Sequence, residues 1–144
     1  MKIKFKLSKG CENLIPKKSY PTDSAFDLMS RISISIEPFK THMIPTGLYI
    51  ELPLGYEAQI RPRSGLALNN NITITNSPAT IDSGYRGEIG VLIFNLGKEN
   101  YNIKRGERIA QMIILKLPKI ELVMTKEIKN SDRNENKLGS TGKY

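Results

Sequence analysis

The residues with the strongest chemical potential lie in the stretch PATIDSGYRGEIG, residues 78–90. This stretch places Asp82, Tyr85 and Arg86 among three glycines, directly after an apolar residue. An ionised aspartate in a concave site can orient a water molecule and take its proton, which typically accelerates a reaction about 10²–10⁴-fold. Small neighbours let a ligand approach the backbone closely. The alternatives are a turn aspartate that bonds its own backbone and, for Tyr85, a ring that only packs.

A second stretch, PRSGLA at residues 62–67, is suited to binding phosphate. Arg63 precedes Ser64 and Gly65, where a short helix is expected to begin. Backbone N–H groups at the start of a helix bind phosphate, and an arginine adds positive charge. An ordinary capped helix is the alternative explanation for this stretch.

Three further positions carry polar groups that could belong to a site. Arg133 and the GSTG run at residues 139–142 could wrap a terminal phosphate with amides and hydroxyls, although a disordered tail is the alternative. Gln111 shares an expected strand with apolar residues, and an amide in such company needs hydrogen-bond partners. Asp27, in SAFDL, precedes a strand-like run and could hold the waters of a bound Mg²⁺.

The elements that must position these residues are mostly strands. One short helix is expected at residues 64–70, with Ser64 as its N-cap and Asn69 or Asn70 closing it. Short strands separated by turn residues favour a sandwich or barrel over alternating β-α-β units. Alternating apolar residues predict the strands, which lie at residues 2–7, 32–36, 43–52, 57–61, 71–75, 88–94, 108–115 and 120–124.

The composition excludes several functional classes. Cys11 is the only cysteine and His42 the only histidine, which excludes an intrachain disulfide and a cysteine zinc site. A Ser-His-Asp triad would need His42, which lies in a strand-like stretch. No apolar run approaches the roughly 20 residues of a membrane span, and the first residues lack a signal-peptide core. We therefore expect a soluble intracellular protein, cytoplasmic, or nuclear if the source is eukaryotic.

The charge and the length set two further expectations. The net charge of +8 serves either solubility or the attraction of an anion, a nucleotide or a nucleic acid. Few aromatic residues stand among the lysines, which argues against a platform for stacking single-stranded nucleic acid. A chain of 144 residues is expected to form one domain. The composition turns polar near residue 129, so we expect a folded domain at residues 1–128 and a flexible arm at residues 129–144.

Five segments of the chain resemble the motifs of the trimeric dUTP pyrophosphatase (dUTPase) family. In the family's order they are SAFDLMS, PRSGLA, TIDSGYRGE, GERIAQM and RNENKLGSTG, and they span residues 24–142. The resemblance implies an all-β, jelly-roll-like distorted barrel with one short helix. It also implies a homotrimer in which the C-terminal arm of one subunit closes over the active site of a neighbour.

The reaction implied by the resemblance is hydrolysis of dUTP to dUMP and diphosphate. This reaction keeps uracil out of DNA and supplies dUMP for dTMP synthesis. Asp82 would activate a water molecule that attacks the α-phosphorus, and Tyr85 would lie beneath the deoxyribose and exclude UTP. Mg²⁺ would be the cofactor, held by Asp27 through water. Arg86 would tie down the turn or contact a neighbouring chain.

The resemblance also implies which residues contact the substrate. Uracil would be recognised by the hairpin before Asp82, the α-phosphate would lie near the strand amide, and the arm would cap the γ-phosphate. The implied substrate-binding residues are Arg63, Ser64, Gly65, Asn76, Thr80, Ile81, Tyr85, Gln111, Arg133, Leu138, Gly139 and Ser140.

The arm departs from the family pattern at Leu138, where the family has a phenylalanine before GSTG. Leucine can cover a uracil ring but cannot stack on it, and aromatic stacking on a base is worth roughly 1–3 kcal/mol. We therefore expect a raised KM for dUTP, and Leu138→Phe should lower it in a steady-state assay. An unchanged or higher KM would contradict this interpretation.

Two alternatives to dUTP hydrolysis stay open at this point. The first is a dCTP deaminase-like enzyme of the same fold, which would release ammonia and needs a glutamate base that the sequence does not place. The second is a catalytically weakened trimer that binds nucleotides or nucleic acid, suggested by the altered arm and a pI of about 9.6. We favour the enzyme and expect no stable complex with nucleic acid or membranes, because a degenerate site would be expected to lose some of its motif residues. Those present are Asp27, Arg63, Ser64, Asp82, Tyr85, Gln111 and Arg133.

Overall fold

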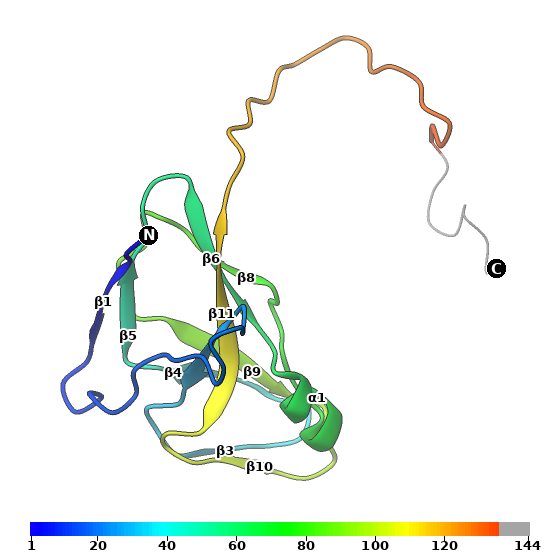
Figure 1. Ribbon diagram of the computed structural model, residues 1–144. Helices are drawn as coiled ribbons and strands as arrows, with labels where there is room; N and C mark the ends of the chain where they lie inside the picture. Colours follow the sequence, from blue (N-terminus) through cyan, green and yellow to red (C-terminus); the bar gives the residue numbers. More distant parts are fainter. Residues whose placement is uncertain (136–144) are drawn as a thin grey trace.

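Strands dominate the fold, as the alternating sequence pattern predicts (Figure 1). The computed structural model describes residues 1–135. The elements in this range are β1 (Lys4–Leu7), β2 (Phe26–Met29), β3 (Ile34–Ile36), β4 (Thr41–Pro45), β5 (Leu48–Glu51), β6 (Tyr56–Arg61), α1 (Ser64–Asn70), β7 (Ile72–Ile74), β8 (Ala79–Ile81), β9 (Gly90–Asn95), β10 (Tyr101–Ile103) and β11 (Arg108–Lys116).

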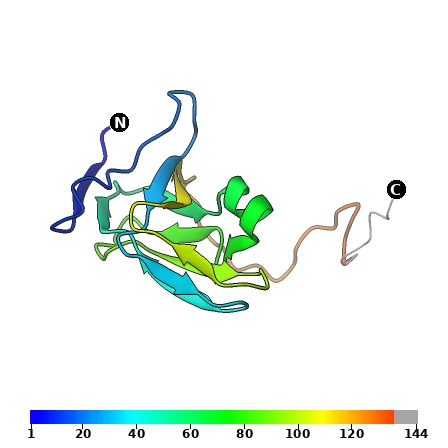
Figure 2. The same cartoon turned by 90° about the horizontal axis from the view of Figure 1, so that it is seen from below.

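The strands form antiparallel sheets whose neighbours are often far apart in the chain (Figures 1 and 2). The largest sheet has the order β2-β11-β6-β8, and a second has the order β4-β9-β7. The pairs β1-β5 and β10-β3 complete the strand pairing of the described chain. This crossed connectivity agrees with the jelly-roll-like all-β fold.

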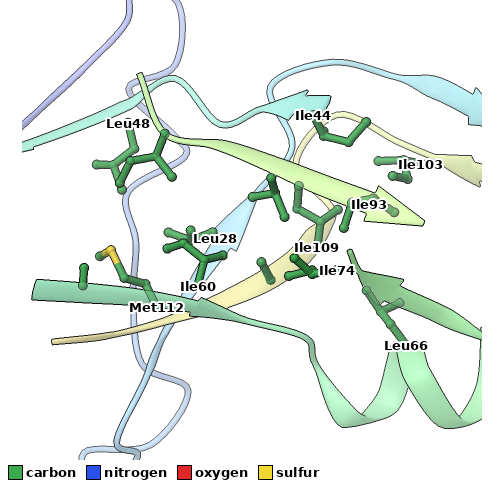
Figure 3. Packing of buried hydrophobic residues seen from close by; sticks show 14 of the residues in the cluster. Leu28, Ile44, Leu48, Ile60, Leu66, Ile74, Ile93, Ile103, Ile109 and Met112 are labelled. Atoms are coloured by element: carbon green, nitrogen blue, oxygen red, sulfur yellow. The ribbon is translucent and has the colours of Figure 1, made fainter. Parts of the chain in front are cut away.

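One apolar core lies between the two larger sheets. Every second residue of β9 is buried, namely Val91, Ile93 and Asn95. In the same way, β6 buries Ala58 and Ile60. Most core residues are isoleucines, which fit the pleated surface because they branch at Cβ. Figure 3 shows the cluster, which also contains Leu28, Ile44, Leu48, Leu66, Ile74, Ile103, Ile109 and Met112.

The helix occupies the expected range, but its caps differ from the expectation. Arg63 is the N-cap, with extended backbone angles and no side-chain capping hydrogen bond, so Ser64 is the first helical residue. Asn71 ends the helix in the left-handed region, at φ 56°, one residue later than expected. Only Leu66 is buried from this helix, so tertiary packing rather than a capping side chain holds it in place.

The long apolar run at residues 43–52 forms two strands, β4 and β5, because the chain turns at Thr46 and Gly47. Gly47 has φ +75°, and a Cβ on this residue would lie 2.8 Å from the Cys11 sulfur. The turn therefore requires glycine at this position. Asp27 lies inside β2 and not before a strand, and the sequence pattern also missed the short strands β8 and β10.

The expected strand at residues 120–124 is wrong. β11 ends at Lys116, and residues 117–135 form neither helix nor strand and run away from the sheets in Figure 1. Leu122 and Met124 are 95% and 99% exposed. An alternating pattern makes a strand only where a neighbouring strand supplies hydrogen bonds and a covering face, and no neighbour lies there within the described chain. Among residues 1–135, no helix is long and apolar enough to span a membrane.

Candidate active site

Asp27 in β2 is the centre of a cluster of charged side chains. Its Oδ1 lies 3.2 Å from Arg63 Nε, and its Oδ2 lies 3.1 Å from Arg108 Nη1. The Ser19 hydroxyl donates to the same Oδ2 at 3.5 Å. Two guanidinium groups therefore share one carboxylate, and the geometry fixes both arginines at the same end of the large sheet.

The strand register explains how Gln111 joins this cluster. Within β11, Gln111 pairs with Asp27 on one side and with Arg61 on the other. Its Nε2 donates to the Pro62 carbonyl at 2.8 Å, so the amide has the partner that a half-buried amide needs. Arg63 Nη1 donates to the Arg108 carbonyl at 2.8 Å, which ties the start of α1 to the start of β11.

A small cavity of about 180 Å³ opens beside Asp27 and Gln111. Ser64 and Gly65 follow Arg63 directly at the beginning of α1, and both are exposed. The structure therefore brings five of the predicted residues to this sheet end or next to it in the chain. The cavity is lined by Asp23, Ser24, Ala25, Asp27, Gln111 and Ile113.

The turn that leads into β11 is held by Glu107. The Tyr101 hydroxyl donates to one oxygen of this carboxylate, and the Lys104 N–H donates to the other at 3.0 Å. Burial, with a contribution from Glu107, raises the pKa of Tyr101 above its ordinary value, so the hydroxyl keeps its proton and its hydrogen bond. The Ser30 N–H donates to the Glu107 carbonyl at 2.9 Å. Arg108, the next residue, therefore follows a turn that several hydrogen bonds hold in place.

Asp82 lies on a second part of the candidate site, directly after β8. The Tyr85 N–H donates to the Asp82 carbonyl at 3.0 Å, and the Tyr85 hydroxyl donates to the Glu88 carbonyl at 2.9 Å. Arg86 Nη1 donates to the carbonyls of Ser83 and Tyr85 at 2.6 and 2.8 Å. The interpretation that Arg86 ties down the turn is thus confirmed.

The Asp82 side chain is exposed. Among residues 1–135, its carboxylate oxygens accept no hydrogen bond, so it does not serve the turn in the way an ordinary turn aspartate does. The turn is instead held by backbone groups and by Arg86. The carboxylate is consequently available to a ligand.

The hairpin before Asp82 contains the other predicted contacts. Asn76 lies in the exposed turn between β7 and β8, and Thr80 and Ile81 lie in β8. Thr80 pairs with Gln59 and Ile81 with Ala58 on β6. The backbone of β8 is therefore fixed against the large sheet up to the residue before Asp82.

One chain does not bring Asp82 to the arginine cluster. Ile81, the residue before Asp82, pairs with Ala58 on β6. Arg63 lies five positions after Ala58, where the chain continues beyond β6 in an extended conformation. At a rise of about 3.3 Å per residue, these positions are roughly 17 Å apart. The Asp82 turn and the Arg63 cluster thus stand at opposite ends of one strand.

The arm residues complete the inventory of predicted contacts. Arg133 lies in the exposed segment after β11, while Leu138, Gly139 and Ser140 lie outside the described residues. Sequence reasoning singled out Gln111 from GERIAQM and missed Arg108. Arg108 lies 81 positions after Asp27 in the chain, so their contact could not be predicted from neighbouring residues. The only sequence signal for Arg108 was that it is a second polar side chain in the motif that contains Gln111.

The protein is mostly β-strand, with the exposed Asp82 carboxylate on a turn and the two arginines of the Asp27 cluster at one end of the large sheet. These are the parts of a site for a polyanionic ligand. Residues 12–142 match the dUTPase family model. The chain belongs to the dUTPase family.

Similar proteins agree with this assignment. The deoxyuridine 5′-triphosphate nucleotidohydrolase of Clostridium tetani is 45% identical over 141 residues, which cover 98% of this chain and 97% of the relative. A variant of the staphylococcal bacteriophage 80alpha dUTPase with dUpNHpp has a TM-score of 0.89 and 26% identity, with 98% of each chain covered. A dUTPase variant from phage phi11 of S. aureus, described for its coordination of a structural Mg(II) ion, has a TM-score of 0.81, 23% identity and coverage of 88% and 98%. This last likeness concerns the fold alone.

Proposed function

We propose that the protein hydrolyses dUTP to dUMP and diphosphate. Membership of the dUTPase family and the activity named for its relatives support this function. The single observation that carries it is Asp82, whose exposed carboxylate accepts no hydrogen bond within residues 1–135 and stands on a turn held by other groups. A carboxylate in that state can accept a proton from water.

In the proposed reaction, Asp82 takes a proton from a water molecule while the water oxygen attacks the α-phosphorus. The new bond joins this oxygen to the α-phosphorus, and the bond from the α-phosphorus to the bridging oxygen breaks, so diphosphate leaves. Phosphoryl transfer depends mainly on positioning and on stabilisation of charge. The ring of Tyr85 would pack beneath the deoxyribose and exclude a 2′-hydroxyl.

The remaining predicted residues would bind the substrate. Asn76 and the backbone at Thr80 and Ile81 would recognise uracil, because they line the hairpin that leads to Asp82. The phosphates would contact Arg63, Ser64, Gly65 and Gln111, and the γ-phosphate would be capped by Arg133, Leu138, Gly139 and Ser140.

We infer that the active protein is a homotrimer with shared sites. The Asp82 turn and the Arg63 cluster lie at opposite ends of β6, whereas one nucleotide must contact both. A second chain can supply the missing half, which makes the oligomer part of the mechanism. The exposed apolar residues after β11, such as Leu122 and Met124, also agree with contacts to another subunit.

Shared sites make a specific prediction for mixed trimers. The variants Asp82→Asn and Arg63→Ala should each be inactive, but trimers containing both should recover activity, because some sites combine an intact Asp82 with an intact Arg63 from another chain. Random assembly would restore about one quarter of the wild-type sites. The measurement is diphosphate release after co-expression. Failure of the co-expressed variants to exceed the separate ones would show that each site belongs to one chain.

The cofactor Mg²⁺ fits this site only in a limited way. Among residues 1–135, no group of three or more His, Cys, Asp or Glu side chains could hold a metal. Asp27 Oδ2 already accepts hydrogen bonds from Arg108 and Ser19, and Oδ1 forms an ion pair with Arg63, so both carboxylate oxygens are engaged. Asp27 would therefore hold Mg²⁺ through a water, with the substrate phosphates as the main ligands. The bound ion would neutralise phosphate charge.

A diphosphate-release assay with dUTP, dCTP, dTTP and UTP tests the proposed function. We expect turnover of dUTP alone, in the presence of Mg²⁺. Ammonia release from dCTP would indicate the deaminase alternative, and binding without turnover would indicate the weakened binding trimer. The expectation of a soluble intracellular protein, in the cytoplasm or nucleus, stays part of this proposal because the reaction acts on the DNA precursor pool.

A further inference from the structure

The charged cluster has more positive charge than its own carboxylate neutralises. Asp27 is the least exposed member, with 16% of its side chain exposed, whereas 28% of Arg63 and 46% of Arg108 are exposed. The carboxylate thus lies beneath the two arginines. One aspartate can balance the charge of one arginine only, and the second charge faces solvent.

Other carboxylates in the neighbourhood are engaged elsewhere. Glu107 accepts from the Tyr101 hydroxyl and the Lys104 N–H. Asp23, which lines the cavity beside Asp27, accepts from the Tyr20 N–H at 2.8 Å. Neither carboxylate forms an ion pair with Arg63 or Arg108 in the part of the chain that the structure describes.

Both guanidinium groups keep donors for a second anion. Arg108 uses Nη1 for Asp27 and Ser19, and within residues 1–135 its Nε and Nη2 make no hydrogen bond. Arg63 uses Nε for Asp27 and Nη1 for the Arg108 carbonyl, and over the same range its Nη2 makes none. A planar guanidinium with spare N–H donors is well suited to phosphate oxygens.

We propose that Arg108 is a further substrate-binding residue that contacts the phosphates beyond the α-phosphate, and that Asp27 is a positioning residue that aims Arg108 and Arg63 at them. This inference rests on the proposed function, because it assigns parts of the same site. Asp27 would fix the two side chains before the substrate arrives, which lowers the entropy that binding would otherwise cost. Its role toward the arginines needs no metal.

The test compares ligands that differ only in their phosphates. Affinities for dUMP, dUpNHpp and inorganic diphosphate are measured by titration calorimetry in EDTA for the wild type, Arg108→Gln and Asp27→Asn. Arg108→Gln should lower the affinity for dUpNHpp and for diphosphate about 10- to 100-fold, the range of a charge-assisted hydrogen bond. The affinity for dUMP should stay within about twofold of the wild-type value. Arg108→Lys should recover part of the loss, because it restores the charge without the planar donors.

Asp27→Asn separates positioning from metal binding. If Asp27 aims the arginines, this variant should lose affinity for dUpNHpp in EDTA while dUMP binding is kept, and Ser19→Ala should lose less. Unchanged dUpNHpp affinity in EDTA would overturn the positioning role. Lys98→Gln removes one positive charge from an exposed loop residue and is the matched control, expected to bind as the wild type does.

Two outcomes would overturn the role of Arg108. One is a dUpNHpp affinity equal to that of the wild type in Arg108→Gln. The other is an equal loss for dUMP and dUpNHpp, which would indicate general damage to the site. Failure of the unmodified protein to release diphosphate from dUTP would instead reject the proposed function. If the unmodified protein turns over dUTP normally and Arg108→Gln binds dUpNHpp as tightly as the wild type, only this inference is rejected.

Discussion

Asp82→Asn is expected to lower kcat for dUTP by about 10²–10⁴-fold, because an amide cannot take the proton of the attacking water. The fold should survive, since the Asp82 turn is held by the Tyr85 N–H and by Arg86, and not by the Asp82 carboxylate. The measurement is steady-state diphosphate release, with thermal unfolding by circular dichroism to verify that the variant folds.

Glu99→Gln is the matched control for this change. It also converts an exposed carboxylate to an amide, and Glu99 lies in the loop between β9 and β10, away from β8. We expect turnover at the wild-type rate. If Asp82→Asn turned over dUTP as fast as Glu99→Gln, another group would have to be the base.

Ile93→Ala should have the largest effect on stability. Ile93 is fully buried in β9, the central strand of its sheet between β4 and β7, and faces the opposite sheet in Figure 3. Truncating a buried isoleucine removes apolar contacts and leaves a cavity that the surrounding sheets fill only in part. The free energy of unfolding should fall by about 2–5 kcal/mol.

Urea unfolding at a fixed protein concentration measures this loss, because oligomer formation makes apparent stability depend on concentration. Leu54→Ala is the control: Leu54 is 93% exposed in the turn before β6, and its truncation should change stability by less than about 0.5 kcal/mol. A cost for Ile93→Ala as small as that of Leu54→Ala would mean that the core between the sheets contributes little.

Strands with several alternating residues could be predicted from the sequence. β6 and β9 bury every second side chain over much of their length, so the two-residue period of a pleated strand is visible in the residues themselves. The alternation around β8 and β10 covers only about three residues, whereas five alternating residues surround the equally short β3 and β7. β8 exists because β6 supplies its hydrogen bonds. The expected strand at residues 120–124 fails for the converse reason, since it has the pattern but no partner within residues 1–135.

The candidate site divides in the same way. The sequence by itself determined the all-β class, the glycine-rich turn with Asp82 and Tyr85, and the order of the five motifs, because these depend on neighbours in the chain. Only the tertiary structure decided that Arg63 and Arg108 share Asp27, a meeting of β2, β11 and the start of α1. It also decided that Asp82 stands at the other end of β6. Such contacts depend on strand register between distant segments, and register is set by the packing of the whole core.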